Sequence, residues 1–214
     1  MYEDFGREHI TEDAVLSPML PVHLVMNAKA AYVTAALLQY DGRRMTVVAD
    51  YIDEGDPGQS AVVLVRRAQL DAPGKVLRVT APAIHFDQNR NVGLRAALAR
   101  VPIDCSIGGD VVQGRQEIQA LLRSTVRGLP AIQVNAGARW TLNGLAGGYC
   151  RALSPGGALV SEPEDNLYTT LMAGIESFCA LTRVRAGGDL EEGANVRTAA
   201  DGRKYRSAMV DRSK

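Results

Sequence analysis

The sequence predicts an α/β fold with a mixed central sheet, in which the first three strands are antiparallel and helices lie on both faces. Three observations support this prediction. Residues 21–52 alternate short apolar runs, rich in β-branched and aromatic residues, with turn residues, as antiparallel strands do. Later in the chain, strand-like runs alternate with segments of helical periodicity, which is typical of parallel strands. The chain has 214 residues, of which 46% are hydrophobic and 22% charged, so it can bury a sizeable core without disulfides or a structural metal.

The antiparallel strands are predicted at 22–26, 31–40 and 43–52. Asp41 and Gly42 stand between the second and third runs and form the dipeptide of a tight hairpin turn. Residues 53–58 (DEGDPG) have turn composition and end the meander. An acidic, proline-containing segment precedes these strands, and we expect residues 1–20 to form a lead-in or linker.

The middle of the chain predicts the parallel part of the sheet. Residues 59–70 fit a helix or a strand by periodicity, and we expect a helix because the sheet needs a covering layer. The remaining segments are a strand and loop at 75–86, a helix at 92–100, a strand at 102–107, a helix at 115–126 and a strand at 130–134. The last strand, helix and strand predict a parallel pair with a right-handed crossover. Residues 141–153 and 158–160 predict a further hairpin.

Residues 167–182 form the clearest helical pattern. Leu167, Leu171, Ile175 and Phe178 fall on one apolar stripe. Ala173 and Glu176 lie together on the margin of that stripe, one turn apart. Acidic residues precede the helix and favour its N-terminal dipole. The pattern ends there, so we expect a core domain at 21–182 and a flexible basic tail at 183–214.

Composition and missing motifs exclude several classes of protein. The 24 basic and 24 acidic residues give no net charge, so any contact with nucleic acid must come from a local patch. Three widely spaced cysteines exclude a zinc ribbon and a disulfide framework and indicate a reducing compartment. No apolar run is long enough to span a bilayer, and the acidic start does not resemble a signal peptide. The P-loop, GxGxxG and GxSxG motifs are all missing from the sequence, so a P-loop ATPase, a nucleotide cofactor and a serine hydrolase are unsupported.

Three carboxylates lie on different predicted elements and could converge on a single metal site. Asp50 lies near the end of a predicted meander strand, Asp110 follows a buried strand, and Glu176 lies on the late helix. Phosphodiester cleavage by two metal ions needs acids that converge in this way, because Mg²⁺ prefers oxygen ligands. Each acid taken alone is more simply explained as a solvated surface charge.

The order of these elements resembles the ribonuclease H-like fold. More specifically, residues 147–181 resemble the end of the nuclease domain of tailed-phage terminase large subunits. The matching residues are Gly147, Gly148, Tyr149, Arg151, Glu162, Pro163, Asn166 and Tyr168. The run PVHLVMNAKAAYVTAALLQYDGRRMTVVADYI resembles the first three strands of that family, and the Gly-Gly-Asp at 108–110 resembles the end of the strand that carries its second acid.

The resemblance implies a metal-dependent endonuclease domain of a viral DNA-packaging terminase, which cuts concatemeric double-stranded DNA. It also implies Mg²⁺ or Mn²⁺ as cofactor, an ATPase domain and a portal protein as partners, and the host cytoplasm as location. Arg139 and Arg151 are candidate contacts to DNA phosphates.

The chain departs from the family at two acidic positions, which align near Asn27 and Ala173. Two interpretations therefore stay open within the family. Either Asp50, Asp110 and Glu176 rebuild a metal site, or the domain has lost cleavage and acts as a DNA- or portal-binding module. An unrelated α/β enzyme that acts on a small molecule is a third possibility.

Overall fold

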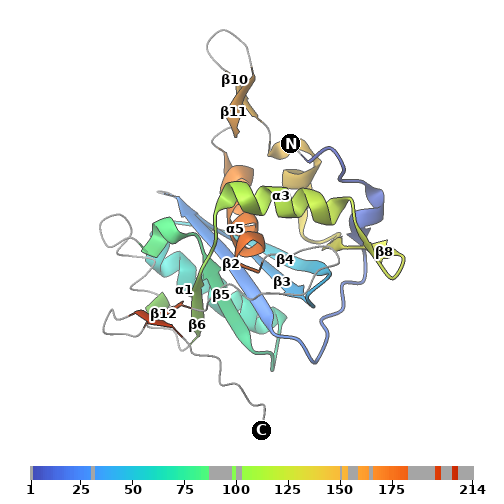
Figure 1. Ribbon diagram of the computed structural model, residues 1–214. Helices are drawn as coiled ribbons and strands as arrows, with labels where there is room; N and C mark the ends of the chain where they lie inside the picture. Colours follow the sequence, from blue (N-terminus) through green and yellow to red (C-terminus); the bar gives the residue numbers. More distant parts are fainter. Residues whose placement is uncertain are drawn as a thin grey trace.

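The central sheet has seven strands in the order β1-β9-β4-β3-β2-β5-β6 (Figure 1). The computed structural model describes residues 2–29, 32–86, 98–99, 103–149, 151–153, 159–163, 166–182, 196–198 and 204–206. The strands of the sheet are Ile10–Thr11 (β1), Val22–Lys29 (β2), Tyr32–Tyr40 (β3), Met45–Glu54 (β4), Leu77–Ala81 (β5), Asp104–Ile107 (β6) and Ile132–Asn135 (β9). Strands β2, β3 and β4 are antiparallel neighbours, and the other pairs are parallel. The predicted mixed sheet is confirmed.

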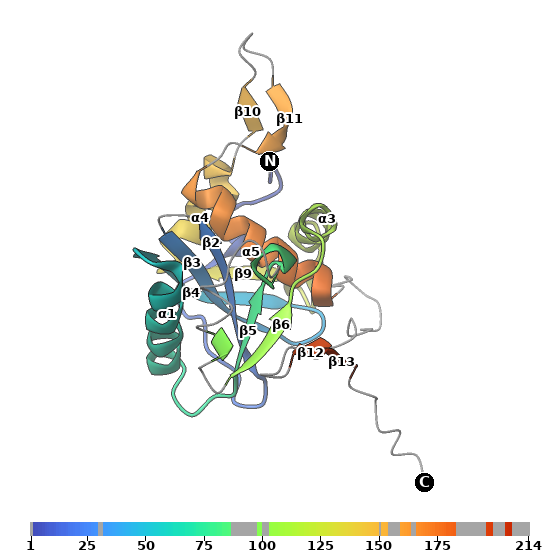
Figure 2. The same cartoon turned by 90° about the vertical axis from the view of Figure 1, so that its left-hand side faces the viewer.

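Helices cover both faces of this sheet (Figure 2). The helices are α1 (Pro57–Asp71), α3 (Val111–Leu122), α4 (Arg139–Asn143) and α5 (Leu167–Thr182), with short helical turns η1 (Arg7–His9), η2 (Ala83–Phe86) and η3 (Gly144–Gly148). Helix α1 lies on one face, and α3, α4 and α5 lie on the other. No described helix is long and apolar enough to cross a membrane.

Small hairpins complete the fold. They are β7 (Thr125–Val126) with β8 (Leu129–Pro130), β10 (Arg151–Leu153) with β11 (Leu159–Pro163), and β12 (Val196–Thr198) with β13 (Lys204–Arg206). The β10–β11 hairpin extends away from the body of the domain in both views.

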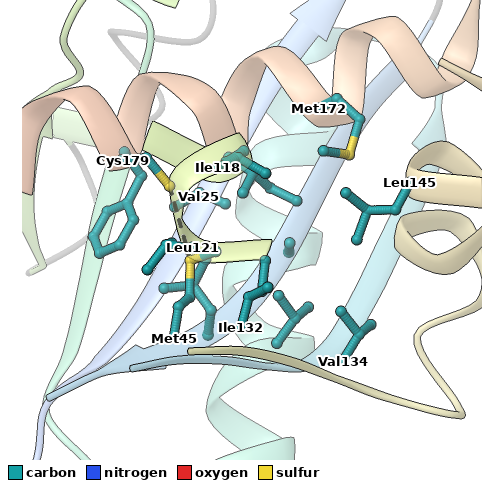
Figure 3. Close-up of a cluster of buried hydrophobic side chains, with 14 of the residues drawn as sticks. Val25, Met45, Ile118, Leu121, Ile132, Val134, Leu145, Met172 and Cys179 are labelled. Carbon is teal, nitrogen blue, oxygen red and sulfur yellow. Dashed lines mark hydrogen bonds between the residues drawn. The ribbon is translucent and has the colours of Figure 1, made fainter. Parts of the chain in front are cut away.

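The side chains of β2 and β3 contribute to two separate hydrophobic cores, one on each face of the sheet, because successive side chains of a strand point to opposite faces. Leu24 and Leu37 pack towards α1, whereas Val25 and Leu38 pack towards α3 and α5. Figure 3 shows the second core, where side chains of α3 and α5 meet those of the sheet. This two-sided burial explains why the strands read as nearly continuous apolar runs.

The start of helix α1 is fixed by a capping aspartate and a proline. The Asp56 carboxylate accepts hydrogen bonds from the backbone N–H groups of Gly58 and Gln59, each at 3.0 Å. Pro57 occupies the first turn, where its missing N–H group costs nothing. These signals resolve the ambiguity of residues 59–70 in favour of a helix, as predicted.

The predicted pairing of the strands at 102–107 and 130–134 is wrong. The two corresponding strands, β6 and β9, lie on opposite sides of the sheet, separated by β4, β3, β2 and β5. Helix α3 crosses the face of the sheet between them and packs against α5. The early antiparallel strands therefore occupy the centre, and each late strand adds to a different side.

Two further expectations need correction or lie outside the described residues. Residues 139–148 are helical (α4 and η3), so the predicted hairpin is reduced to β10 and β11. The bends at Gly144–Gly148 allow this chain segment to pack beneath α5. Of the helix predicted at 92–100, only residues 98–99 are described.

Residues 2–11, which belong to the expected lead-in at 1–20, lie against the domain. Strand β1 pairs in parallel with β9 at the edge of the sheet, and Tyr2 is buried in the core. Most of the expected tail at 183–214 lies outside the described residues, which include only β12 and β13 of that segment.

Helices α3 and α5 touch through a glycine. A Cβ atom at Gly114 would lie 1.7 Å from the backbone oxygen of Glu176, which is far inside van der Waals contact. Gly174 of α5 differs, because a Cβ atom there would find its nearest neighbours at 3.6 Å, an ordinary contact with Asn27 and Met26.

We expect Gly114→Ala to lower the free energy of unfolding by about 3 kcal/mol, because the two helices must separate to admit the methyl group. Chemical denaturation measures the change. Gly174→Ala is the matched control, and it should leave stability unchanged or raise it by up to about 1 kcal/mol through helix propensity. Equal effects of the two substitutions would contradict the close contact of α3 and α5.

Candidate functional site

The carboxyl ends of β2 and β5 meet under α5, because these parallel strands are neighbours. Asn27 comes from the end of β2, and His85 from η2, just after β5. The Asn27 Nδ2 group donates to the backbone oxygen of Thr170 at 2.9 Å, and Asn27 Oδ1 accepts from Ala28 N–H at 2.9 Å. A short contact joins His85 Nε2 to Asn27 Oδ1. We call Asn27, His85 and Thr170, with Tyr32, the Asn27 cluster.

The ring of His85 is held at its Nε2 atom. Asn27 Nδ2 faces Thr170 and Asn27 Oδ1 faces His85 Nε2, which also lies 3.2 Å from the backbone N–H group of Ala28. Burial lowers the pKa of His85 to about 4, so the ring is neutral at neutral pH. The Tyr32 hydroxyl lies 3.1 Å from Thr170 Oγ1 on the other side of the cluster. The cluster contains no carboxylate.

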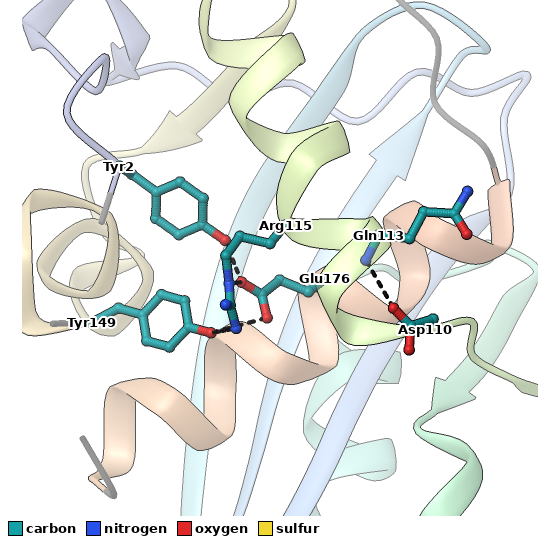
Figure 4. Close-up of polar contacts among 6 residues, drawn as sticks. All are labelled: Tyr2, Asp110, Gln113, Arg115, Tyr149 and Glu176. Atoms are coloured by element: carbon teal, nitrogen blue, oxygen red, sulfur yellow. Dashed lines mark hydrogen bonds and ion pairs between the residues drawn. The ribbon is translucent and has the colours of Figure 1, made fainter. Parts of the chain in front are cut away.

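Glu176 occupies a different place from the one its helical position predicts. Its side chain is fully buried and accepts hydrogen bonds from Tyr2 Oη at 2.5 Å, Arg115 Nε at 3.0 Å and Tyr149 Oη at 3.1 Å (Figure 4). Arg115 also contacts the Tyr149 hydroxyl, and its guanidinium lies 5.2 Å from the centre of that ring. Burial raises the pKa of Glu176, and the hydrogen bonds from Tyr2 and Arg115 oppose the rise. We call these four residues the Glu176 network.

The carboxylates of Asp110 and Asp50 each accept a hydrogen bond from a backbone N–H group in the first turn of a helix. Asp110 Oδ1 accepts a hydrogen bond from Gln113 N–H at 2.9 Å and caps α3. Figure 4 shows this carboxylate joined to Gln113, with no contact to Glu176. Asp50 Oδ2 accepts from Thr141 N–H at 2.6 Å, in the first turn of α4. Burial raises the pKa of Asp50, and the hydrogen bond from Thr141 acts in the opposite direction.

The residues at these positions do not fit a two-metal centre. Among the described residues, no group of three histidine, cysteine, aspartate or glutamate side chains is arranged to hold a metal ion. The ends of β2 and β5 offer an amide and a neutral imidazole, whereas Mg²⁺ is bound through carboxylates and water. Glu176 is already ion-paired with Arg115.

The candidate DNA contacts lie in separate elements. Arg139 is exposed at the start of α4, beside Trp140, whose ring lies 6.2 Å from that of Tyr168. Arg151 begins β10, and its side chain lies outside the described part of the chain.

No pattern in the sequence connects His85 with Asn27. The two residues are 58 positions apart and meet only because β5 pairs with β2. The strand β5 (Leu77–Ala81) could have indicated this contact. Because β5 is parallel to β2, the residues that follow β5 lie near the carboxyl end of β2.

The sequence matches no protein-family model and no curated protein. Solved structures do match. The large terminase of a thermophilic bacteriophage, in complex with ADP, aligns with a TM-score of 0.62 at 14% identity, over 85% of this chain and 44% of that one. Another crystal form of the same protein aligns with a TM-score of 0.60 at 15% identity, over 83% of this chain and 43% of the terminase chain.

The nuclease domain of the g2p large terminase from bacteriophage SPP1, a structure with bound Mn, aligns with a TM-score of 0.53 at 12% identity. That alignment covers 86% of this chain and 98% of the SPP1 domain. The chain thus spans less than half of the thermophilic phage's large terminase and the whole architecture of the SPP1 domain. It has the ribonuclease H-like fold of terminase nuclease domains, as the sequence predicted.

We expect Tyr2→Phe to lower the free energy of unfolding by about 1.5–3 kcal/mol, because it removes a buried hydrogen bond to a charged carboxylate. Tyr40→Phe is the matched control, since the Tyr40 hydroxyl is buried and has no hydrogen-bond partner among the described residues. That variant should keep or gain stability. Denaturant titration of both proteins compares them, and equal losses would contradict the role of Tyr2.

The depressed pKa of His85 predicts a loss of stability in acid. The folded state holds the ring neutral down to about pH 4, whereas the unfolded chain takes up a proton near pH 6.5. Protonation therefore favours unfolding, and stability present above pH 6.5 is lost as the pH falls towards 4. His85→Gln should remove up to about 3 kcal/mol of this pH dependence. Denaturation curves from about pH 7 to 4 test it, and parallel profiles for both proteins would contradict it.

Proposed function

We propose that this chain is a non-cleaving domain of the terminase nuclease fold that binds DNA. The observation that carries the proposal is the Asn27 cluster. Asn27 and His85 contact each other at the ends of β2 and β5, and among the described residues no carboxylate lies between them. Without acidic ligands, a divalent cation lacks the charge that would hold it there.

The Glu176 network supports the same proposal. Withdrawing Glu176 to bind a metal would break the ion pair of Arg115 and leave two tyrosine hydroxyls without their acceptor. Breaking a buried ion pair in this way typically costs about 3–5 kcal/mol. A carboxylate held by three donors is better suited to joining segments than to releasing and rebinding a cation.

Metal-dependent DNA cleavage is the competing proposal, and the likeness to the SPP1 nuclease domain with bound Mn favours it. In that case Asp50, Asp110 and Glu176 would converge on Mg²⁺ or Mn²⁺ after a rearrangement. Both proposals place the chain in a viral DNA-packaging complex in the host cytoplasm, beside a terminase ATPase domain and a portal protein. Arg139 and Arg151 would contact DNA in either case.

The deciding experiment is cleavage of supercoiled plasmid in Mg²⁺ or Mn²⁺. We expect no metal-dependent cleavage by the wild-type protein, and none by Asp50→Asn or Asp110→Asn, while duplex DNA binds at low salt. Wild-type cleavage that Asp110→Asn abolishes would establish the nuclease instead. Failure to bind duplex DNA even at low salt would remove the DNA-binding role.

The variant Asn27→Asp/Ala173→Asp extends this test. Thr170 and Gly174 of α5 both lie against Asn27, so Ala173 is on the turn of α5 nearest to the cluster. Restoring acids at both positions should increase Mn²⁺ affinity, which calorimetry measures. The single variant Ala173→Asp is the control for added charge.

A further inference from the structure

A basic pocket lies at the opposite end of the sheet from the Asn27 cluster. It has a volume of about 580 Å³ and is lined by Arg43, Arg44, Arg127, Asp41, Val126 and Leu129. Asn27 pairs with Thr34 on β3, whereas the pocket begins just beyond Tyr40 at the other end of that strand. Six residues of β3 separate the two places, which is about 20 Å at the usual rise of a strand.

The pocket forms where two hairpin turns meet. Arg43 and Arg44 belong to the turn between β3 and β4, and Arg127 belongs to the turn between β7 and β8. The turns are held together just inside the pocket, where Met45 N–H donates to the backbone oxygen of Ala131 at 2.8 Å. The three guanidinium groups therefore come from two rigidly joined turns.

The charge of the pocket is not neutralised within the described chain. None of the three arginines has an ion-pair partner among the described residues. The one carboxylate of the lining, Asp41, accepts hydrogen bonds from the backbone N–H groups of Arg43 and Arg44, at 2.8 and 2.6 Å. Its role is to shape the turn, and the pocket keeps an excess of positive charge.

Arg127 occupies a backbone conformation that disfavours its side chain. Its φ of 55° is the only positive value at a non-glycine residue in the described chain, and Gly128 follows with a φ of 80°. A tight turn with two positive φ angles normally selects Asn-Gly. Arginine in this position costs roughly 1 kcal/mol or more, which asparagine would reduce. Because asparagine would be more stable at this position, the arginine side chain suggests a role in binding a ligand.

We propose that Arg43, Arg44 and Arg127 bind the phosphate groups of a duplex DNA backbone in this pocket. The planar guanidinium group forms paired hydrogen bonds with phosphate oxygens, and three of them around one concavity match adjacent phosphates. Val126 and Leu129 form an apolar wall against which the sugar can lie. This inference rests on the proposed DNA-binding function and locates it away from Arg139 and Arg151.

The test measures duplex affinity by fluorescence anisotropy over a series of salt concentrations. Arg127→Asn should raise the melting temperature, weaken binding, and reduce the slope of log affinity against log salt by about 1. Arg43→Ala/Arg44→Ala/Arg127→Asn should reduce that slope by about 3. Arg66→Ala, an exposed arginine on α1, is the matched control and should change neither stability nor slope.

The outcomes separate the pocket from the proposed function. Duplex binding that the triple variant retains unchanged would overturn the pocket and leave the DNA-binding function in place. Failure of the wild-type protein to bind duplex DNA would overturn both. The amide chemical shifts of the three arginines can also be followed by NMR. If they change on addition of inorganic phosphate and do not change on addition of duplex DNA, the pocket binds small phosphate compounds instead.

Discussion

The buried ion pair between Glu176 and Arg115 joins α5 to α3, and two further segments of the chain donate to the same carboxylate. Tyr2 from the N-terminal segment, Arg115 from α3 and Tyr149 after η3 all donate to one carboxylate on α5. A carboxylate buried without donors would destabilise the fold, and the donors remove that cost only together. Close contact of α3 and α5 at Gly114 is what brings Arg115 within reach.

This arrangement limits the chemistry of the domain. An acid on the late helix is available to a metal only when it faces the ends of the central strands, and Glu176 faces α3 and the N-terminal segment instead. The ends of β2 and β5 carry Asn27, which hydrogen-bonds to α5, and a neutral His85, which contacts Asn27. In the described part of the chain, internal hydrogen bonds and no carboxylate are found at this place.

The two ends of the sheet differ in their balance of charge. At the Asn27 end, polar groups are buried and paired with one another, so they contribute to stability and specificity of packing. At the other end, Arg43, Arg44 and Arg127 gather around an open pocket, and one of them holds an unfavourable backbone conformation. The strained conformation of Arg127 and the excess positive charge of the pocket are the two features on which the proposed phosphate site rests.

The sequence alone determined the elements whose signals are local. The strands β2, β3 and β4, the presence of a turn at Asp41 and helix α5 follow from periodicity and turn chemistry, which act over a few residues, although the turn extends to Arg44. Only the tertiary structure decided which side of the sheet receives β6 and β9, that His85 meets Asn27, and that Tyr2 reaches Glu176 from 174 positions away. Helical periodicity placed Glu176 on the margin of an apolar stripe, but it could not show that α3 covers that margin. Such contacts depend on how whole elements pack, and no local pattern of residues encodes that choice.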